Sequence, residues 1–112
     1  EKQGFEHADA ELFVGRTCVV TPDSHPPDEV VERVVTWWRD VGMVVERLSP
    51  VEHDRALART SHVPHLVAAG LAASLDPRDL RWAGTGFRDT TRIAAGDPEL
   101  WTAILRENRE QV

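Results

Sequence analysis

The sequence predicts a mainly α-helical fold with a small α/β part. Two short valine-rich runs, residues 17–21 and 43–48, have the composition of strands and flank a stretch whose apolar residues recur at helical spacing. Downstream, two helix starts combine a capping residue with a proline, at residues 49–50 and 97–98. We therefore expect a strand, a helix and a strand, followed by helices.

Composition narrows the class of protein. A chain of 112 residues, 41% hydrophobic and 29% charged, suits one small globular domain or a piece of a larger protein. The net charge of −6 disfavours a nucleic-acid partner, and no apolar run approaches the roughly 20 residues of a membrane span. Cys18 is the single cysteine, so an internal disulfide is excluded. No secretory signal is visible, and we expect a cytoplasmic protein without membrane contact.

The first elements follow from local pattern. We expect a loop over residues 1–15, with apolar anchors such as Phe5 and one helical turn over residues 8–13. Residues 17–21 form a strand that Pro22 ends, and Cys18 within it is a small buried hydrophobe.

An amphipathic helix is predicted from Asp28 to Val41, with Gly42 as the left-handed residue that ends it. The second strand covers residues 43–48, so the segment has the form of a βαβ crossover with the helix packed on a sheet. Two strands make a poor sheet alone, and we expect the missing strands upstream of Glu1.

A second helix begins with a full start signal. Ser49 can cap it, proline takes the first helical position, and Glu52 can complete a capping box. We expect the helix to run to about Leu75, with a kink near Thr60–Ser61 because Pro64 removes an internal hydrogen bond.

Beyond that kink the helix is rich in alanine and glycine and almost uniformly apolar. It should be buried, either within its own domain or against another subunit. Asp76 and Pro77 end it. The last helix starts at Asp97-Pro98 and runs to about Glu110, with one apolar face formed by Leu100, Trp101, Ile104 and Leu105.

Two histidines three residues apart, His62 and His65, should lie near one face of the kinked helix. They could bind a metal, although further ligands are lacking and we predict no metal. They could also hydrogen-bond an anionic substrate, or be satisfied internally by backbone or buried water.

Arg92 lies in a segment bounded by Gly86 and Gly96, and its planar fork could bind a carboxylate. A surface or helix-capping role is the alternative. Gly84 and Gly86 permit either a close backbone approach or a positive φ in a glycine-flanked turn.

The four tryptophans are mostly candidates for the core, Trp37 and Trp38 because they lie on the apolar face of their helix. Trp82 is also counted with the core, and Trp101 could instead wall a pocket beside Arg92.

Several ordered motifs resemble those of the prephenate dehydrogenase family, and the similarity extends over essentially the whole chain. They are Gly-Arg-Thr-Cys-Val-Val-Thr-Pro at 15–22, Ser-Pro-Val-Glu-His-Asp at 49–54, Ser-His-Val-Pro-His-Leu at 61–66, Gly-Phe-Arg-Asp-Thr-Thr-Arg-Ile-Ala at 86–94 and Asp-Pro-Glu-Leu-Trp at 97–101. Together they form a specific signature, which no one of them would provide alone.

The resemblance implies a division into two parts. Residues 1–48 would be the C-terminal tail of a nucleotide-binding Rossmann-like domain, and residues 49–112 a truncated helical substrate-binding and dimerisation domain. NAD or NADP would be bound mainly by the N-terminal domain of the complete protein. The catalytic histidine of the family is expected just upstream of Glu1, so the isolated chain should be inactive.

The same resemblance implies an NAD(P)-dependent oxidation and decarboxylation of prephenate, or arogenate, in tyrosine biosynthesis by a homodimer. Arg92 would bind a substrate carboxylate, and His65 would add a polar contact. The backbone at Thr85 and Gly86 would pass close to the substrate, although the family often has glycine in place of Thr85. Trp101 would support the pocket.

Two other readings remain open. The chain could be a non-catalytic helical dimerisation or ligand-sensing module, which the apolar small-residue helix would suit. It could also belong to another nicotinamide-dependent dehydrogenase with a helical C-terminal domain, whose motifs fit less well.

Overall fold

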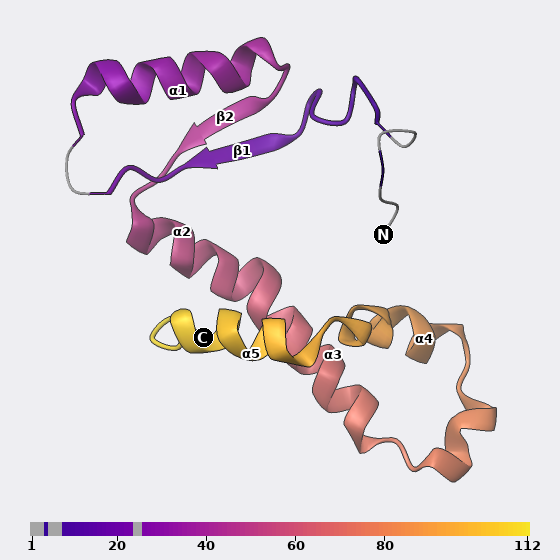
Figure 1. Ribbon diagram of the computed structural model, residues 1–112. Helices are drawn as coiled ribbons and strands as arrows, with labels where there is room; N and C mark the ends of the chain where they lie inside the picture. The colour runs from indigo at the N-terminus through magenta and orange to yellow at the C-terminus, as the bar shows by residue number, and fades with distance from the viewer. Residues whose placement is uncertain (1–3, 5–7, 24–25) are drawn as a thin grey trace. The chain divides into compact units, whose positions relative to one another are not determined.

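The computed structural model describes residues 4, 8–23 and 26–112 (Figure 1). The chain divides into two compact units, Glu1–His53 and Asp54–Val112. The predicted anchor Phe5 lies outside the described residues. Among the residues that the structure does describe, every helix is too short or too polar to cross a bilayer.

The first unit contains the predicted βαβ crossover. Strands β1 (Thr17–Val20) and β2 (Val44–Arg47) pair in parallel, with Thr17 opposite Val44. The connecting helix α1 (Asp28–Asp40) packs against β2, and Figure 1 shows it lying along the two strands. The predicted segment 8–13 forms consecutive turns that lead into β1.

Helix α1 carries two apolar stripes rather than one. Val35 is fully buried and Trp38 half-buried, the latter in edge contact with Phe13 at a ring-centroid distance of 6.0 Å. Trp37 is 59% exposed, so its prediction as a core residue is wrong within this chain. The reason is that Trp37 follows Val30 and Val34 along the second stripe, on the outer side of the helix. Gly42 has a φ of 93°, as the predicted left-handed helix end requires.

The second helix starts as the capping box predicts. The Ser49 amide donates to Glu52 Oε2 at 2.9 Å, and the Glu52 amide donates to Ser49 Oγ at 3.3 Å. Helix α2 (Pro50–Leu57) passes into a π-helical turn, η2 (Ala58–His62), and then into α3 (Val63–Ser74). The predicted irregularity near Thr60–Ser61 is therefore a π turn. Its wide geometry suits a proline that cannot donate to the Thr60 carbonyl.

Helix α3 is less buried than its composition predicts. His65 and Ala68 are its buried residues, whereas Val67 is 60% exposed. Of the two predicted alternatives, burial within its own unit does not hold for most of this helix, because α4 and the 3-10 segment that follows it pack on α3 and leave its other apolar side uncovered. Burial against another subunit stays a prediction.

The chain after α3 is a series of short helices: η3 (Pro77–Trp82), α4 (Thr85–Thr91), η4 (Arg92–Ala95) and α5 (Pro98–Glu107). The Asp76 side chain caps η3 by accepting from the Arg78 amide, and Asp97 caps α5 in the same way by accepting from the Glu99 amide. Helix α5 ends at Glu107, earlier than the predicted Glu110, and turns follow it.

Two smaller predictions for this region are wrong. Trp82 is 74% exposed because it ends a 3-10 segment on the surface, where its ring lies under the Arg81 guanidinium at 4.9 Å. Leu100, predicted on one face of α5 with the half-buried Ile104 and Leu105, is itself 57% exposed. The expected glycine-flanked turn is instead the start of α4, and Gly84 has an ordinary negative φ of −79°.

Candidate functional site

The helical unit is organised around the Trp101 side chain. The His65 imidazole stacks on the indole with ring centroids 3.5 Å apart and planes 11° from parallel. The His62 ring meets the indole edge-on at 6.3 Å and 83°. Both histidines are buried, at 6% and 5% exposure for His62 and His65. Their three-residue spacing across the end of the π turn places both rings on the side that α5 covers.

Asn108 fixes the His62 ring. Its Nδ2 donates to the Asp54 carbonyl oxygen at 2.8 Å and lies 3.1 Å from His62 Nδ1. A carbonyl can only accept, so the amide nitrogen of Asn108 must face Asp54, and its second hydrogen points to His62. His62 Nδ1 therefore accepts, and the proton of the neutral ring is on Nε2. Asn108 is itself buried, which shields these hydrogen bonds from water.

Gly96 provides the space that the stacked rings occupy. A Cβ atom at this position would lie 2.5 Å from Trp101 Nε1 and 3.3 Å from His65 Cε1. The backbone of Gly96 has φ −63°, which any residue can adopt. The glycine is needed here for its missing side chain and not for its conformational freedom.

An open hollow of about 380 Å³ lies beside this cluster. Its walls combine the π turn, the start of α3, η4 and α5, and its lining residues are Thr60, Ser61, Pro64, His65, Ile93 and Trp101. His65 Nδ1 is the single buried side-chain polar atom of the described residues without a hydrogen-bond partner. Such unpaired buried atoms are uncommon in native proteins, and a ligand or a water in the hollow would supply the missing partner.

The structure brings together two of the five predicted site residues, His65 and Trp101. Arg92 begins η4, directly before Ile93 of the hollow, and its side chain is exposed. Its guanidinium makes no ion pair or hydrogen bond with the part of the chain that the structure describes. Thr85 and Gly86 lie in the first turn of α4, and a Cβ atom on Gly86 would meet nothing within 4 Å. Arg92, Thr85 and Gly86 are not part of the hollow's lining.

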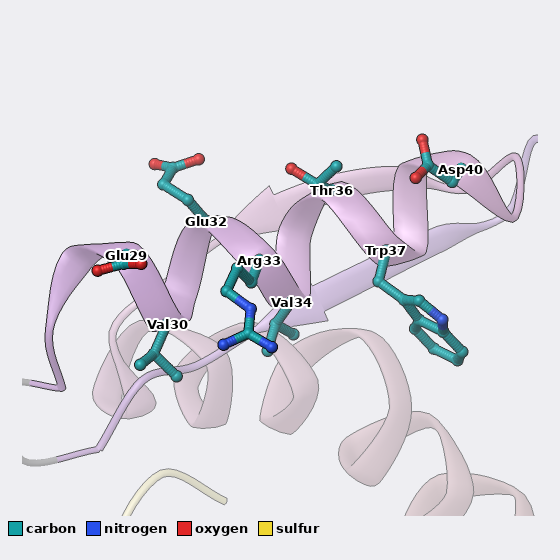
Figure 2. Close-up of a pocket in the computed structure, with 8 residues that line it drawn as sticks. All are labelled: Glu29, Val30, Glu32, Arg33, Val34, Thr36, Trp37 and Asp40. Carbon is teal, nitrogen blue, oxygen red and sulfur yellow. The ribbon is translucent and has the colours of Figure 1, made fainter.

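A second hollow, of about 740 Å³, lies on the outer side of α1 in the first unit. Figure 2 shows Val30, Val34 and Trp37 on one side of the helix, and Glu32, Thr36 and Asp40 on the opposite side. Its apolar residues are spaced as a helix-packing stripe and carry no group suited to catalysis. The hollow therefore has the character of a packing surface.

The sequence reasoning missed Asn108 and Gly96. Asn108 lies 46 residues from His62 and looks like an ordinary residue at a helix end, so no local pattern indicates the contact. In the sequence, Gly96 marks only a boundary of the Arg92 segment, whereas its role in the structure is steric. Within residues 4, 8–23 and 26–112, no three His, Cys, Asp or Glu side chains are arranged to hold a metal ion.

Known dehydrogenases are similar in sequence to this chain over nearly its whole length. Residues 49–112 match the family model of the prephenate dehydrogenase dimerization domain. The chain is 34% identical to a cyclohexadienyl dehydrogenase of Zymomonas mobilis, covering 96% of this chain and 39% of that protein. It is 33% identical to a prephenate dehydrogenase of Bacillus subtilis, covering 99% of this chain and 32% of that protein.

A solved structure is similar over the full chain. The prephenate dehydrogenase of A. aeolicus, crystallised with hydroxyphenyl propionate and NAD+, matches with a TM-score of 0.81 and 39% identity, covering 100% of this chain and 41% of that one. The present chain thus spans about a third to two fifths of the length of these relatives.

Proposed function

This chain belongs to the prephenate dehydrogenase family, and from that premise we propose that it is the C-terminal portion of an NAD- or NADP-dependent dehydrogenase acting on prephenate or arogenate. The observation that supports this proposal most strongly is the match of residues 49–112 to the family's dimerization domain. We propose that residues 1–48 are the tail of the nucleotide-binding domain and that residues 49–112 provide substrate binding and dimerisation.

Arg92 is the proposed anchor for the substrate. Its guanidinium has no partner among the described residues and could form two parallel hydrogen bonds with a carboxylate. His65, in the adjacent hollow, would add a polar contact, and the indole of Trp101 would support its ring. Thr85 and Gly86 would line the path of the bound molecule from the start of α4. The hydroxyphenyl propionate in the A. aeolicus structure is a ring with a carboxylate side chain, which supports this assignment by chemical type.

We assign cofactor binding mainly to the nucleotide-binding portion of the complete protein. When bound, NAD or NADP supplies the acceptor for the hydride that leaves the substrate's carbinol carbon. The residues of this chain contribute by orienting the substrate. Two hydrogen bonds from the guanidinium to the carboxylate fix the substrate's position, and a fixed position lowers the entropic part of the activation barrier.

The uncovered side of α3 is the proposed dimer surface. Its exposed apolar side chains follow helical spacing and are 37–60% exposed: Val63, Leu66, Val67 and Leu71. A second copy would remove them from water, as an isologous interface does. Val67→Lys should shift the protein to monomer in light scattering, whereas Leu80→Lys, which changes an equally exposed leucine on η3, should leave the dimer intact. A dimer that survives Val67→Lys would refute this surface.

We propose that the outer apolar stripe of α1, formed by Val30, Val34 and Trp37, packs against the part of the nucleotide-binding domain that precedes this chain. A two-stranded parallel sheet is marginal alone, and larger parallel sheets carry neighbouring helices side by side. Trp37→Glu should therefore lower the melting temperature of the complete protein by more than that of the 112-residue chain, in which Trp37 loses only its edge contact with Trp38 (Figure 2). Equal effects on both proteins would contradict the proposal.

The activity itself is tested on the complete protein. Arg92→Ala should raise the substrate KM by about 10- to 100-fold, as expected for loss of a charge-assisted pair of hydrogen bonds. The cofactor KM should change less than about twofold, because the anchor meets the substrate alone. Arg106→Ala removes the same charge from an exposed position on α5 and serves as the control. Equal loss for both ligands, or none, would overturn the assignment, and a dimer without dehydrogenase activity would favour the non-catalytic module.

A further inference from the structure

We propose that Asn108 and His62 form a positioning pair, which holds the Trp101 indole against His65 and thereby fixes the imidazole at the hollow. The inference rests on the proposed function in one respect, the contact of His65 with substrate. The arrangement of the rings is independent of it. Asn108 and His62 reach the hollow only through Trp101, since neither residue is part of its lining.

The contacts form a series that leads from the Asp54 carbonyl to the His65 ring. The Asp54 carbonyl fixes the Asn108 amide, the amide fixes the His62 ring through Nδ1, and the His62 ring meets the indole edge-on. The indole then stacks on His65. Each link limits the rotation of the next side chain, and the last ring is the one at the hollow.

Two features indicate positioning beyond packing. Filling the space between η2 and the end of α5 requires only apolar side chains, whereas here a buried amide and a buried imidazole are matched through one nitrogen each. Such a pair sets an orientation, which an apolar contact does not. Gly96 limits the indole at Nε1 and Cδ1, where a single methyl group would collide with it. The indole is therefore restricted both by the His62 ring and by the Gly96 backbone.

The pair is tested first by the ring stack itself. In the complete protein with isotopically labelled histidine, the His65 ring protons should resonate upfield because the indole lies face-on to them. Asn108→Leu, which keeps the branched heavy-atom skeleton but removes the donor, should abolish that upfield shift. It should also raise the substrate KM by on the order of 10- to 100-fold with little change in the cofactor KM, as expected for a displaced binding group.

A double variant separates positioning from stability. In His62→Leu with Asn108→Leu, both polar partners are gone and no unpaired buried imidazole remains, so thermal stability should recover. If the pair positions the rings, the upfield shift and the KM should not recover with it. Recovery of the KM in the double variant, or an unchanged His65 shift in Asn108→Leu, would overturn the proposal.

The two hypotheses fail in different ways. If His65→Ala and Arg92→Ala leave the substrate KM unchanged, the proposed substrate site fails, and the His65 ring shift still decides whether the pair holds the stack. If those variants raise the KM while Asn108→Leu changes neither the KM nor the shift, the positioning pair alone is refuted.

Discussion

Replacing Gly96 with alanine should displace the Trp101 indole and destabilise the helical unit. The new methyl group would lie 2.5 Å from Trp101 Nε1 and 2.9 Å from Cδ1. Carbon atoms pack at about 3.5–4.0 Å, so the indole must move by about 1 Å. The His65 Cε1 atom lies only 3.3 Å from the same methyl group, so the methyl group cannot avoid the indole by shifting toward His65. Inserting one methyl group into such a site costs about 1–3 kcal/mol.

Urea unfolding followed by helical circular dichroism measures this cost. For a domain of this size each kcal/mol corresponds to about 4–8 °C in melting temperature. Gly86→Ala is the matched control: its Cβ meets nothing within 4 Å, and its stability should stay within about 0.5 kcal/mol of the parent. The indole N–H signal of Trp101 should shift in Gly96→Ala and stay in the control. A Gly96→Ala variant with parental stability and an unmoved indole signal would refute the steric argument.

Three further outcomes are expected. Ser49→Ala should cost about 1 kcal/mol in urea unfolding, because the Glu52 amide loses its acceptor. Gly42→Ala should cost roughly 1–2 kcal/mol in the same assay, because alanine is strained at a φ of 93°. A hydrogen bond from the Arg78 side chain holds the pKa of Asp76 below its usual range, and in an NMR titration Arg78→Ala should return it toward that range. The stability that the depressed pKa of Asp76 contributes is fully present above the ordinary carboxyl pKa and is lost as the pH falls through the depressed pKa. Because Arg78→Ala lessens the depression, the variant should lose its stabilisation at a higher pH than the parent protein.

The sequence predicts elements well wherever the signal is local. The capping box at Ser49, the cap at Asp97 and the left-handed Gly42 all act within four residues, and the structure confirms them. Burial of whole faces was predicted less well. The sequence shows that α1 and α3 each have an apolar face, which favours burial. It does not show whether that face is buried by the same chain or by another one. The prediction that Trp37 is a core residue is wrong for that reason.

The candidate site was predictable only in part. His62 and His65 share a face because of their spacing, and Trp101 follows a cap that places it on α5, so each could be singled out from the sequence. Their assembly depends on contacts that span distant parts of the chain. Asn108 reaches His62 across 46 residues, and the steric role of Gly96 exists only once Trp101 has folded over it. The role of Arg92 came from the family resemblance and remains a prediction.

Burial in the helical unit argues that folding and self-association are coupled. Its buried apolar side chains among the described residues are Ala58 and Ala68, beside the buried polar groups of His62, His65 and Asn108. Two alanines contribute little apolar area. The exposed stripe of α3, by contrast, holds four larger side chains that are still 37–60% exposed. Burying such a side chain from full exposure contributes about 1.5–3 kcal/mol, so covering the exposed parts of all four would contribute about 3–5 kcal/mol. That is a large fraction of the stability of a small domain. The melting temperature should therefore rise with protein concentration, as mass action requires for a dimer that stabilises its own fold. A melting temperature that stays constant across a hundredfold concentration range in which light scattering detects monomer and dimer would contradict this coupling.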